Sequence, residues 1–291
     1  MANSNLNDEL LYAESLMAGG QFEEAQQKLS DLAEDAEEYV ADNCHTTEDT
    51  QWFAFPTIFE RLAYRRVEKD PRTLKDVGEP FERLYSDYAI ASLKVGDNDA
   101  AEAALKQAIR WDPMNCGARL DLAELNKEKG NMQEYLALSY SVFSRGSDAR
   151  HLARAFANFS EYFAAEKKPK TQAAALRAAR RLDMGDDEKL TDMLTEVKGT
   201  DHDPDSVDDQ QTEELLGKEG IPAGANADIA VCLLMCASDV AQMGNKNLAT
   251  ELTIRARDLI GTKNCEALLD LIHANDKEWR EGEARGKAKE E

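Results

Sequence analysis

The sequence predicts an all-α fold built from stacked antiparallel helix pairs. Three observations predict it. Small and bulky residues recur at a fixed period, glycine and proline interrupt the apolar segments where helices would end, and no alternating apolar run indicates a strand. The chain has 291 residues, of which 42% are hydrophobic and 32% charged, with only 16 glycines and 7 prolines. This composition supplies a core and favours helices over strands.

A period of 34 residues organises the middle of the chain. Ala89 recurs as Ala123 and Ala157, and Gly96 recurs as Gly130. The bulky residue before each alanine recurs as well, as Tyr88, Leu122 and Phe156. Such self-similarity indicates a repeat protein in which each unit buries its apolar face against its neighbours.

The best-preserved unit reads as two helices joined by a short turn. The first helix is FERLYSDYAIASLKV, followed by the turn GDND and the second helix AAEAALKQAIRW. Gly96 suits the left-handed conformation at a helix C-terminus, and Asn98 or Asp99 is expected to cap the second helix. That helix should end at Asp112 and Pro113, because proline cannot continue a helix.

Four other segments follow the same plan. Residues 116–146 form the next unit, and residues 148–183 form a third with a longer turn expected around Pro169. Further copies occur near the ends of the chain, at 10–32 and at 229–261.

The pattern resembles the tetratricopeptide-repeat family, whose units are helix pairs of about 34 residues. Ala89, Gly96, Ala101, Ala108 and Pro113 occupy the places of the family's small residues, turn glycine and closing proline. The resemblance is strongest over 82–184 and weaker over 6–40 and 228–262. The sequence departs from the family at Tyr85, where the family has tryptophan, at Tyr135, where a small residue is usual, and at Ser147, where proline is usual. The resemblance implies a right-handed α-solenoid with a concave inner surface.

Five regions follow from this organisation. They are an N-terminal region of degenerate helical repeats (1–81), a three-repeat array (82–184), an acidic linker (185–222), a C-terminal helix pair with a capping helix (223–282) and a charged tail (283–291). The linker is expected to hold at most short helices, because it is rich in Asp, Glu, Gly and Thr.

An aromatic cluster at residues 52–59 has two interpretations. Trp52, Phe53, Phe55 and Phe59 crowd the start of an expected helix. Aromatic residues at helical spacing usually belong to the core, which favours packing of a degenerate repeat against the first regular one. The alternative is an exposed docking patch.

The charge of the chain excludes some classes of partner. The net charge is −22, which argues against general nucleic-acid binding because phosphates require a positive surface. Residues 61–182, with 22 basic and 17 acidic side chains, are the basic part.

No apolar run reaches the roughly 20 residues that span a bilayer, and no signal peptide is recognisable. Five cysteines without disulfide-like spacing favour a reducing, cytoplasmic location.

No motif indicates catalysis, and no cofactor or metal is expected. There is no phosphate-binding glycine loop and no histidine pair at metal-ligand spacing. Cys232 and Cys236 share a helix face, where core packing is favoured over metal binding. Asp201, Asp203 and Asp205 match the first spacings of a calcium loop, but Thr212 stands where the bidentate glutamate belongs, so a solvated acidic linker is favoured.

The resemblance implies that first helices line the groove and that a partner peptide binds there. Transferred by offset, the groove candidates are Arg83, Ser86, Ile90, Lys94, Leu120, Glu124, Lys127, His151, Arg154, Asn158 and Glu161. Arg154 and Asn158 match one pair of the clamp with which some relatives hold the C-terminal carboxylate of heat-shock chaperones. Ser86 and Ile90 do not match it, and Asp121 would repel a carboxylate, so clamp-type binding is not expected.

These features predict a cytoplasmic, non-catalytic interaction module that binds a protein or peptide, with no nucleic-acid or membrane partner. The alternative is a regulatory subunit or an enzyme whose site the sequence does not reveal, since fold does not fix function. The acidic linker directly follows the basic array. It is therefore a candidate pseudo-ligand that folds back into the groove through salt-sensitive pairing.

Overall fold

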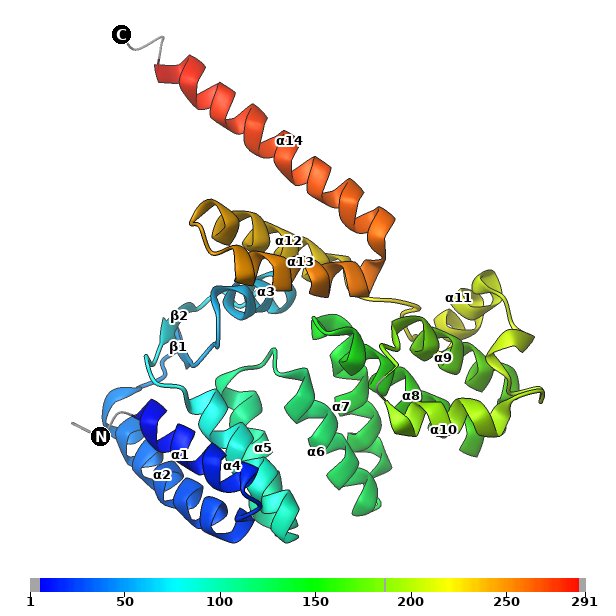
Figure 1. The fold of residues 1–291 in the computed structure, drawn as a ribbon, viewed down its shortest axis with the longest axis horizontal. Helices are drawn as coiled ribbons and strands as arrows, with labels where there is room; N and C mark the ends of the chain where they lie inside the picture. The colour runs from blue at the N-terminus through cyan, green and yellow to red at the C-terminus, as the bar shows by residue number, and fades with distance from the viewer. Residues whose placement is uncertain (1–5, 186, 288–291) are drawn as a thin grey trace. The chain divides into compact units, whose positions relative to one another are not determined.

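The structure, a computed structural model, describes residues 6–185 and 187–287, with side chains up to Ala274 (Figure 1). In this part of the chain the protein is mostly helical: 75% of the residues lie in helices, and there are 14 α-helices and two short strands. The prediction of a mostly helical protein is therefore confirmed. None of the described helices is long and apolar enough to cross a membrane.

Five antiparallel helix pairs lie where the sequence places them. The pairs are α1 (Leu6–Ala18) with α2 (Phe22–Asn43), α4 (Phe81–Val95) with α5 (Asn98–Trp111), α6 (Cys116–Glu128) with α7 (Met132–Arg145), α8 (Ala149–Ala165) with α9 (Pro169–Leu182), and α12 (Ala227–Gln242) with α13 (Lys246–Ile260). In each pair the two helices pack along one another. Small side chains such as Ala89, Ala101 and Ala108 are buried at these contacts, so the helices approach closely.

The turn between α4 and α5 shows how the sequence ends a helix. Gly96 adopts the left-handed conformation with φ of 81°. Its N–H donates to the Leu93 carbonyl, and the Asp97 N–H donates to that of Ser92, so the last carbonyls of α4 are satisfied. The cap of α5 is Asp97, whose carboxylate accepts from the Ala100 N–H. The expectation of Asn98 or Asp99 is wrong because the helix begins at Asn98.

The turn between α8 and α9 has the same length as the turns of the other pairs, apart from the α4–α5 turn, which is one residue shorter. Lys168 precedes α9, Pro169 opens it, and Lys167 takes the left-handed conformation with φ of 56° that glycine supplies elsewhere. Proline suits the first position of a helix, where its missing N–H removes no hydrogen bond.

An insertion separates the first helix pair from the second. It consists of β1 (Thr50–Phe53), α3 (Ile58–Glu68) and β2 (Thr73–Asp76), with the strands parallel and Thr50 opposite Thr73. The Ala54 N–H donates to the Trp111 carbonyl, which fixes β1 to the end of α5. No strands were predicted here, and a degenerate helical repeat was expected. Both predictions are wrong, because the segment forms two strands and one helix.

The aromatic cluster forms the core of this insertion. Phe53 and Phe59 are buried, and the ring of Phe53 lies 4.8 Å from those of Phe55 and Tyr64. Only Ile58 is extensively exposed among the large apolar residues of this segment. The core interpretation of the cluster therefore agrees with the structure.

The chain divides into two compact units, residues 1–145 and 146–291. In the first unit the three helix pairs follow one another side by side, with α2 packed on α4 and α5 on α6 (Figure 1). Their apolar side chains form one core that extends from Leu6 to Leu138. The division falls inside the segment 82–184, which the sequence suggested as one array.

In the second unit the segment 185–222, which was predicted to be an acidic linker, packs on α9. The acidic segment forms α10 (Glu188–Val197), the 3-10 turn Pro204–Ser206 and α11 (Asp209–Lys218). The turn and α11 pack along α9, where Arg177 and Arg181 pair with Asp209, and Arg180 pairs with Asp205 at 2.6 Å. The segment thus holds two short helices, as expected, and it also packs on α9, which its composition did not indicate.

A long helix ends the second unit. Helix α14 (Thr262–Lys287) contacts α12 and α13 near its start, where Cys265 is buried. The expected tail of 283–291 is helical as far as Lys287, and its last residues, 288–291, lie outside the described part.

Candidate functional site

The exposed face of α4 brings together three of the predicted groove residues. Phe81, Leu84 and Ala89 point into the core on one side of this helix. Arg83, Ile90 and Lys94 lie on the opposite side, and Ile90 is 45% exposed. Their spacing of seven and four residues keeps them on one stripe of the helix surface.

Arg83 also connects α4 to α1. Its Nη2 lies 2.6 Å from Oε1 of Glu14 in a half-buried ion pair. Asp87, one turn after Arg83, shares this contact region. Burial, together with the nearby Glu14 carboxylate, raises the pKa of Asp87 to about 7. One carboxylate oxygen of Asp87 is buried and has no hydrogen-bond partner among the described residues.

On its other edge α4 is connected to α6. The Ser86 hydroxyl donates to Oε1 of Glu82 at 3.1 Å. Asn115, the N-cap of α6, donates from Nδ2 to Glu82 at 2.7 Å and to Ser86 at 3.3 Å. Burial raises the pKa of Glu82. Ser86 therefore helps to hold the first helices of two successive pairs together and is only partly accessible.

On α6 the structure corrects one predicted residue. Leu120 is 0% exposed and belongs to the core, so its side chain does not line an open surface. Cys116, Leu120 and Ala123 follow the apolar spacing of a buried helix face, and this signal was available in the sequence. Glu124 and Lys127 are half-buried and pair with each other at 3.8 Å, and Lys127 also lies 5.3 Å from the Tyr135 ring centroid.

An acidic stripe of α6, half-buried at Asp121 and Glu124 and exposed at Glu128, was not among the predicted groove residues. It includes Asp121 and Glu128, which lie on the same side of the helix as Glu124. Asp121 was considered only as an obstacle to carboxylate binding. The stripe of α4 thus presents the exposed Ile90 between two cationic side chains.

Helix α8 carries the last four predicted residues in the second unit. His151 and Arg154 are half-buried, and Glu161 pairs with Lys189 of α10 at 3.1 Å. Asn158 is only 2% exposed, so it is not an accessible groove residue as expected. Offsets within a repeat could not show this, because they assign a position and not its burial.

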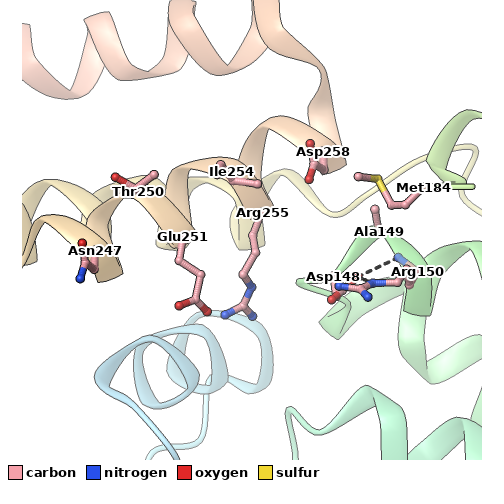
Figure 2. Close-up of a pocket in the computed structure, with 10 residues that line it drawn as sticks. All are labelled: Asp148, Ala149, Arg150, Met184, Asn247, Thr250, Glu251, Ile254, Arg255 and Asp258. Carbon is pink, nitrogen blue, oxygen red and sulfur yellow. Dashed lines mark hydrogen bonds and ion pairs between the residues drawn. The ribbon is translucent and has the colours of Figure 1, made fainter. Parts of the chain in front are cut away.

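A separate pocket of about 510 Å³ lies in the second unit between the start of α8 and α13 (Figure 2). Its apolar lining includes Met184 and Ile254. Most of its polar groups have structural partners. Asp148 caps α8 and pairs with Arg150, Arg255 donates to the Ser147 carbonyl and hydroxyl, and Asp258 pairs with Arg257. Of these contacts, those of Arg255 join α13 to the segment before α8, and the others lie within one element.

The remaining candidates for chemistry have structural roles. Cys232 and Cys236 are buried in α12, in agreement with core packing. Within the described residues no group of three metal-ligating side chains was found. The Asp203 carboxylate accepts from the backbone N–H groups of Gly199 and Asp205, and the Asp205 carboxylate pairs with Arg180.

Comparison with known proteins gives this chain no family. No protein-family model matches the sequence, and a search of curated proteins found no match.

Proposed function

We propose that this protein is a non-catalytic interaction module, a tetratricopeptide-like solenoid that binds a segment of a partner protein on the faces of its first helices. The observation that carries the proposal is the exposed stripe of α4, where Ile90 lies between the cationic Arg83 and Lys94. An apolar side chain within a charged surface offers a contact that gains free energy when a partner covers it.

The neighbouring first helices support this surface. Glu14 of α1 and Asn115 of α6 both contact side chains of α4, so the three helices lie edge to edge. These contacts hold the α4 stripe in place before any partner arrives, which reduces the ordering cost of binding.

A photoreactive residue at position 90 tests the proposal. We expect ultraviolet irradiation of this variant in extract of the source cell to give a covalent adduct with one protein. The matched control carries the same residue at Ala103, which is exposed on α5. The substitutions Arg83→Ala and Lys94→Ala should reduce adduct formation at position 90. Equal adducts at positions 90 and 103 would contradict the proposal.

The alternative is a regulatory subunit or an enzyme that uses the pocket between α8 and α13. Its volume suits a small ligand. We favour the interaction module, because the charged groups of the pocket are used in capping and ion pairs. If the pocket were the functional site, Glu251→Gln should abolish the regulatory or catalytic activity that depends on this pocket. The adduct at position 90 should then be unchanged.

A further inference from the structure

The pocket in the second unit has walls from two separate parts of the chain. One wall is a face of α13, on which Asn247, Glu251, Ile254 and Asp258 recur every three or four residues. The buried residues of α13 lie on its other face. The start of α8 and the connection after α9 supply the second wall. The cavity measures about 510 Å³, which lies in the range of sites that bind small ligands.

Part of the pocket is an apolar surface that is open to solvent. Ile254 on α13 is 41% exposed, and Met184, in the connection after α9, is 51% exposed. Both line the pocket, together with the buried Ala149 at the start of α8. Large apolar side chains from two segments therefore border one cavity, and a ligand that covers them gains free energy.

One charged group of the pocket, the Glu251 carboxylate, has no partner within the described part of the chain. Asp148 pairs with Arg150, and Asp258 pairs with Arg257. Glu251 lines the cavity and is exposed, and its side chain makes neither a hydrogen bond nor an ion pair with a described residue. Its negative charge is therefore the one that a ligand can neutralise.

Arg255 is the expected partner of Glu251, but it is engaged elsewhere. A glutamate followed four residues later by an arginine commonly forms an ion pair on a helix. Figure 2 shows both side chains extending from the same face of α13. The Arg255 guanidinium donates instead to Ser147, from Nε to the carbonyl at 3.3 Å and from Nη2 to the hydroxyl at 2.5 Å. The Glu251 carboxylate is thus left to a cation from outside the chain.

From these observations we infer that the pocket binds a linear alkyl cation, with its aliphatic stem against Met184 and Ile254 and its charged head on Glu251. A lysine side chain of a partner protein has this chemistry, and so has a free alkylamine. Such groups cover apolar surface with their methylenes while the cation reaches a polar partner. Asn247, one turn before Glu251, adds an amide oxygen that can accept from the head group. The inference goes beyond the proposed function and does not depend on it.

The methyl group of Met184 reports on the pocket in the full chain. The chain has 8 methionines, so its carbon-13 methionine methyl spectrum is simple, and Met184→Leu assigns the signal. We expect pentylammonium chloride to shift this resonance with saturation, at a dissociation constant on the order of 1–10 mM. Each methylene removed from the stem should weaken binding about threefold. Uncharged pentanol should bind about fivefold more weakly than pentylammonium.

Glu251→Gln separates the charge of the pocket from its shape. The substitution keeps the size of the side chain, so pentylammonium should bind about fivefold more weakly while pentanol binds as before. Glu213→Gln, at an exposed position of α11 outside the pocket, is the matched control and should leave both affinities unchanged. Ile254→Ala should weaken the binding of pentylammonium and of pentanol alike, because it removes part of the apolar wall.

A capped tripeptide with a central lysine distinguishes the two sources of the cation. Tighter binding of the tripeptide than of pentylammonium would assign the pocket to a lysine side chain of a partner protein. Equal or weaker binding of the tripeptide would assign it to a free alkylamine.

Two results would overturn the inference. The first is a Met184 shift that is absent or grows without saturation for both probes, which would mean that the pocket holds no ligand of this class. The second is equal binding of pentylammonium by the native protein and by Glu251→Gln, which would mean that Glu251 recognises no cation. Neither result affects the adduct expected at Ile90 in the first unit, so failure of this inference is distinguishable from failure of the proposed function.

Discussion

At the residue scale, Asp87 shows how the packing of two helices changes an ionisable group. Its carboxyl lies beside Glu14 at the contact between α1 and α4, and its pKa is raised to about 7 from an ordinary value of 3.8. The folded state therefore holds a proton that the unfolded chain releases at lower pH. Stability should fall as the pH rises from about 4 to 7 and stay low above that range.

Asp87→Asn should remove this loss, because the amide is neutral at every pH and still donates to Glu14. We expect the variant to match the native protein at pH 4 and to exceed its unfolding free energy by about 1–3 kcal/mol at pH 8. Urea denaturation at both pH values measures this. Asp35→Asn on the exposed side of α2 is the control. Parallel pH profiles for Asp87→Asn and the native protein would contradict the assignment.

Ala101 tests close packing in the best-preserved helix pair. It is fully buried in α5, where a larger side chain has no room. We expect Ala101→Leu to lower the unfolding free energy by about 1–3 kcal/mol. Ala103→Leu, on the exposed side of the same helix, should change it little. A melting temperature for Ala101→Leu equal to that of the control would count against the packing described here.

At the element scale, the helix pairs were predictable because local residues determine them. Gly96, Gly130 and the small residues at a 34-residue period determine turns and contacts within one unit. The strands were not predictable, since each has four residues and pairs with a partner more than twenty residues away. In the candidate site, the offsets carried over from the resemblance located Arg83, Ile90 and Lys94 on the accessible stripe of α4. The same offsets did not show that Asn158 and Leu120 are buried, because an offset carries no information on what packs against a side chain.

The acidic segment at 201–219 also belongs to this scale. Its carboxylates pair with the basic side chains of α9, but these pairs are largely exposed, and water and salt weaken such pairs. Val207 and Leu216 are buried in the same segment, and Ile221 is buried directly after it. Because apolar burial outweighs exposed pairs, we expect this segment to stay packed on α9 rather than to act as a salt-sensitive ligand of the groove.

Leu216→Ala should therefore destabilise the second unit by about 2–4 kcal/mol, whereas Asp209→Asn should have a small effect. Hydrogen exchange of residues 204–218 in 50 mM and 500 mM sodium chloride measures the docking directly. We expect protection of this segment to be nearly equal at the two salt concentrations. Loss of protection at high salt would instead support the pseudo-ligand interpretation drawn from charge alone.

At the scale of the whole molecule, the division after Arg145 falls inside the predicted array of residues 82–184. Residues 1–145 contain three helix pairs and their own core from Leu6 to Leu138. A repeat protein needs about three stacked pairs to be stable, and the first unit meets this number without residues of the second. The insertion adds the buried Phe53 and Phe59 and the ion pair between Glu68 and Arg145, all within the unit.

We therefore expect the fragment 1–145 to fold on its own. Circular dichroism should show a helical spectrum, and thermal unfolding should be a single cooperative transition. The matched fragment 1–113 ends after α5 and lacks the third pair, so it should be less stable or unfolded. If 82–184 were instead one indivisible array, a cut at 145 would remove the partner of its second pair. Fragment 1–145 would then lose most of its helical signal, and fragment 1–184 would regain it.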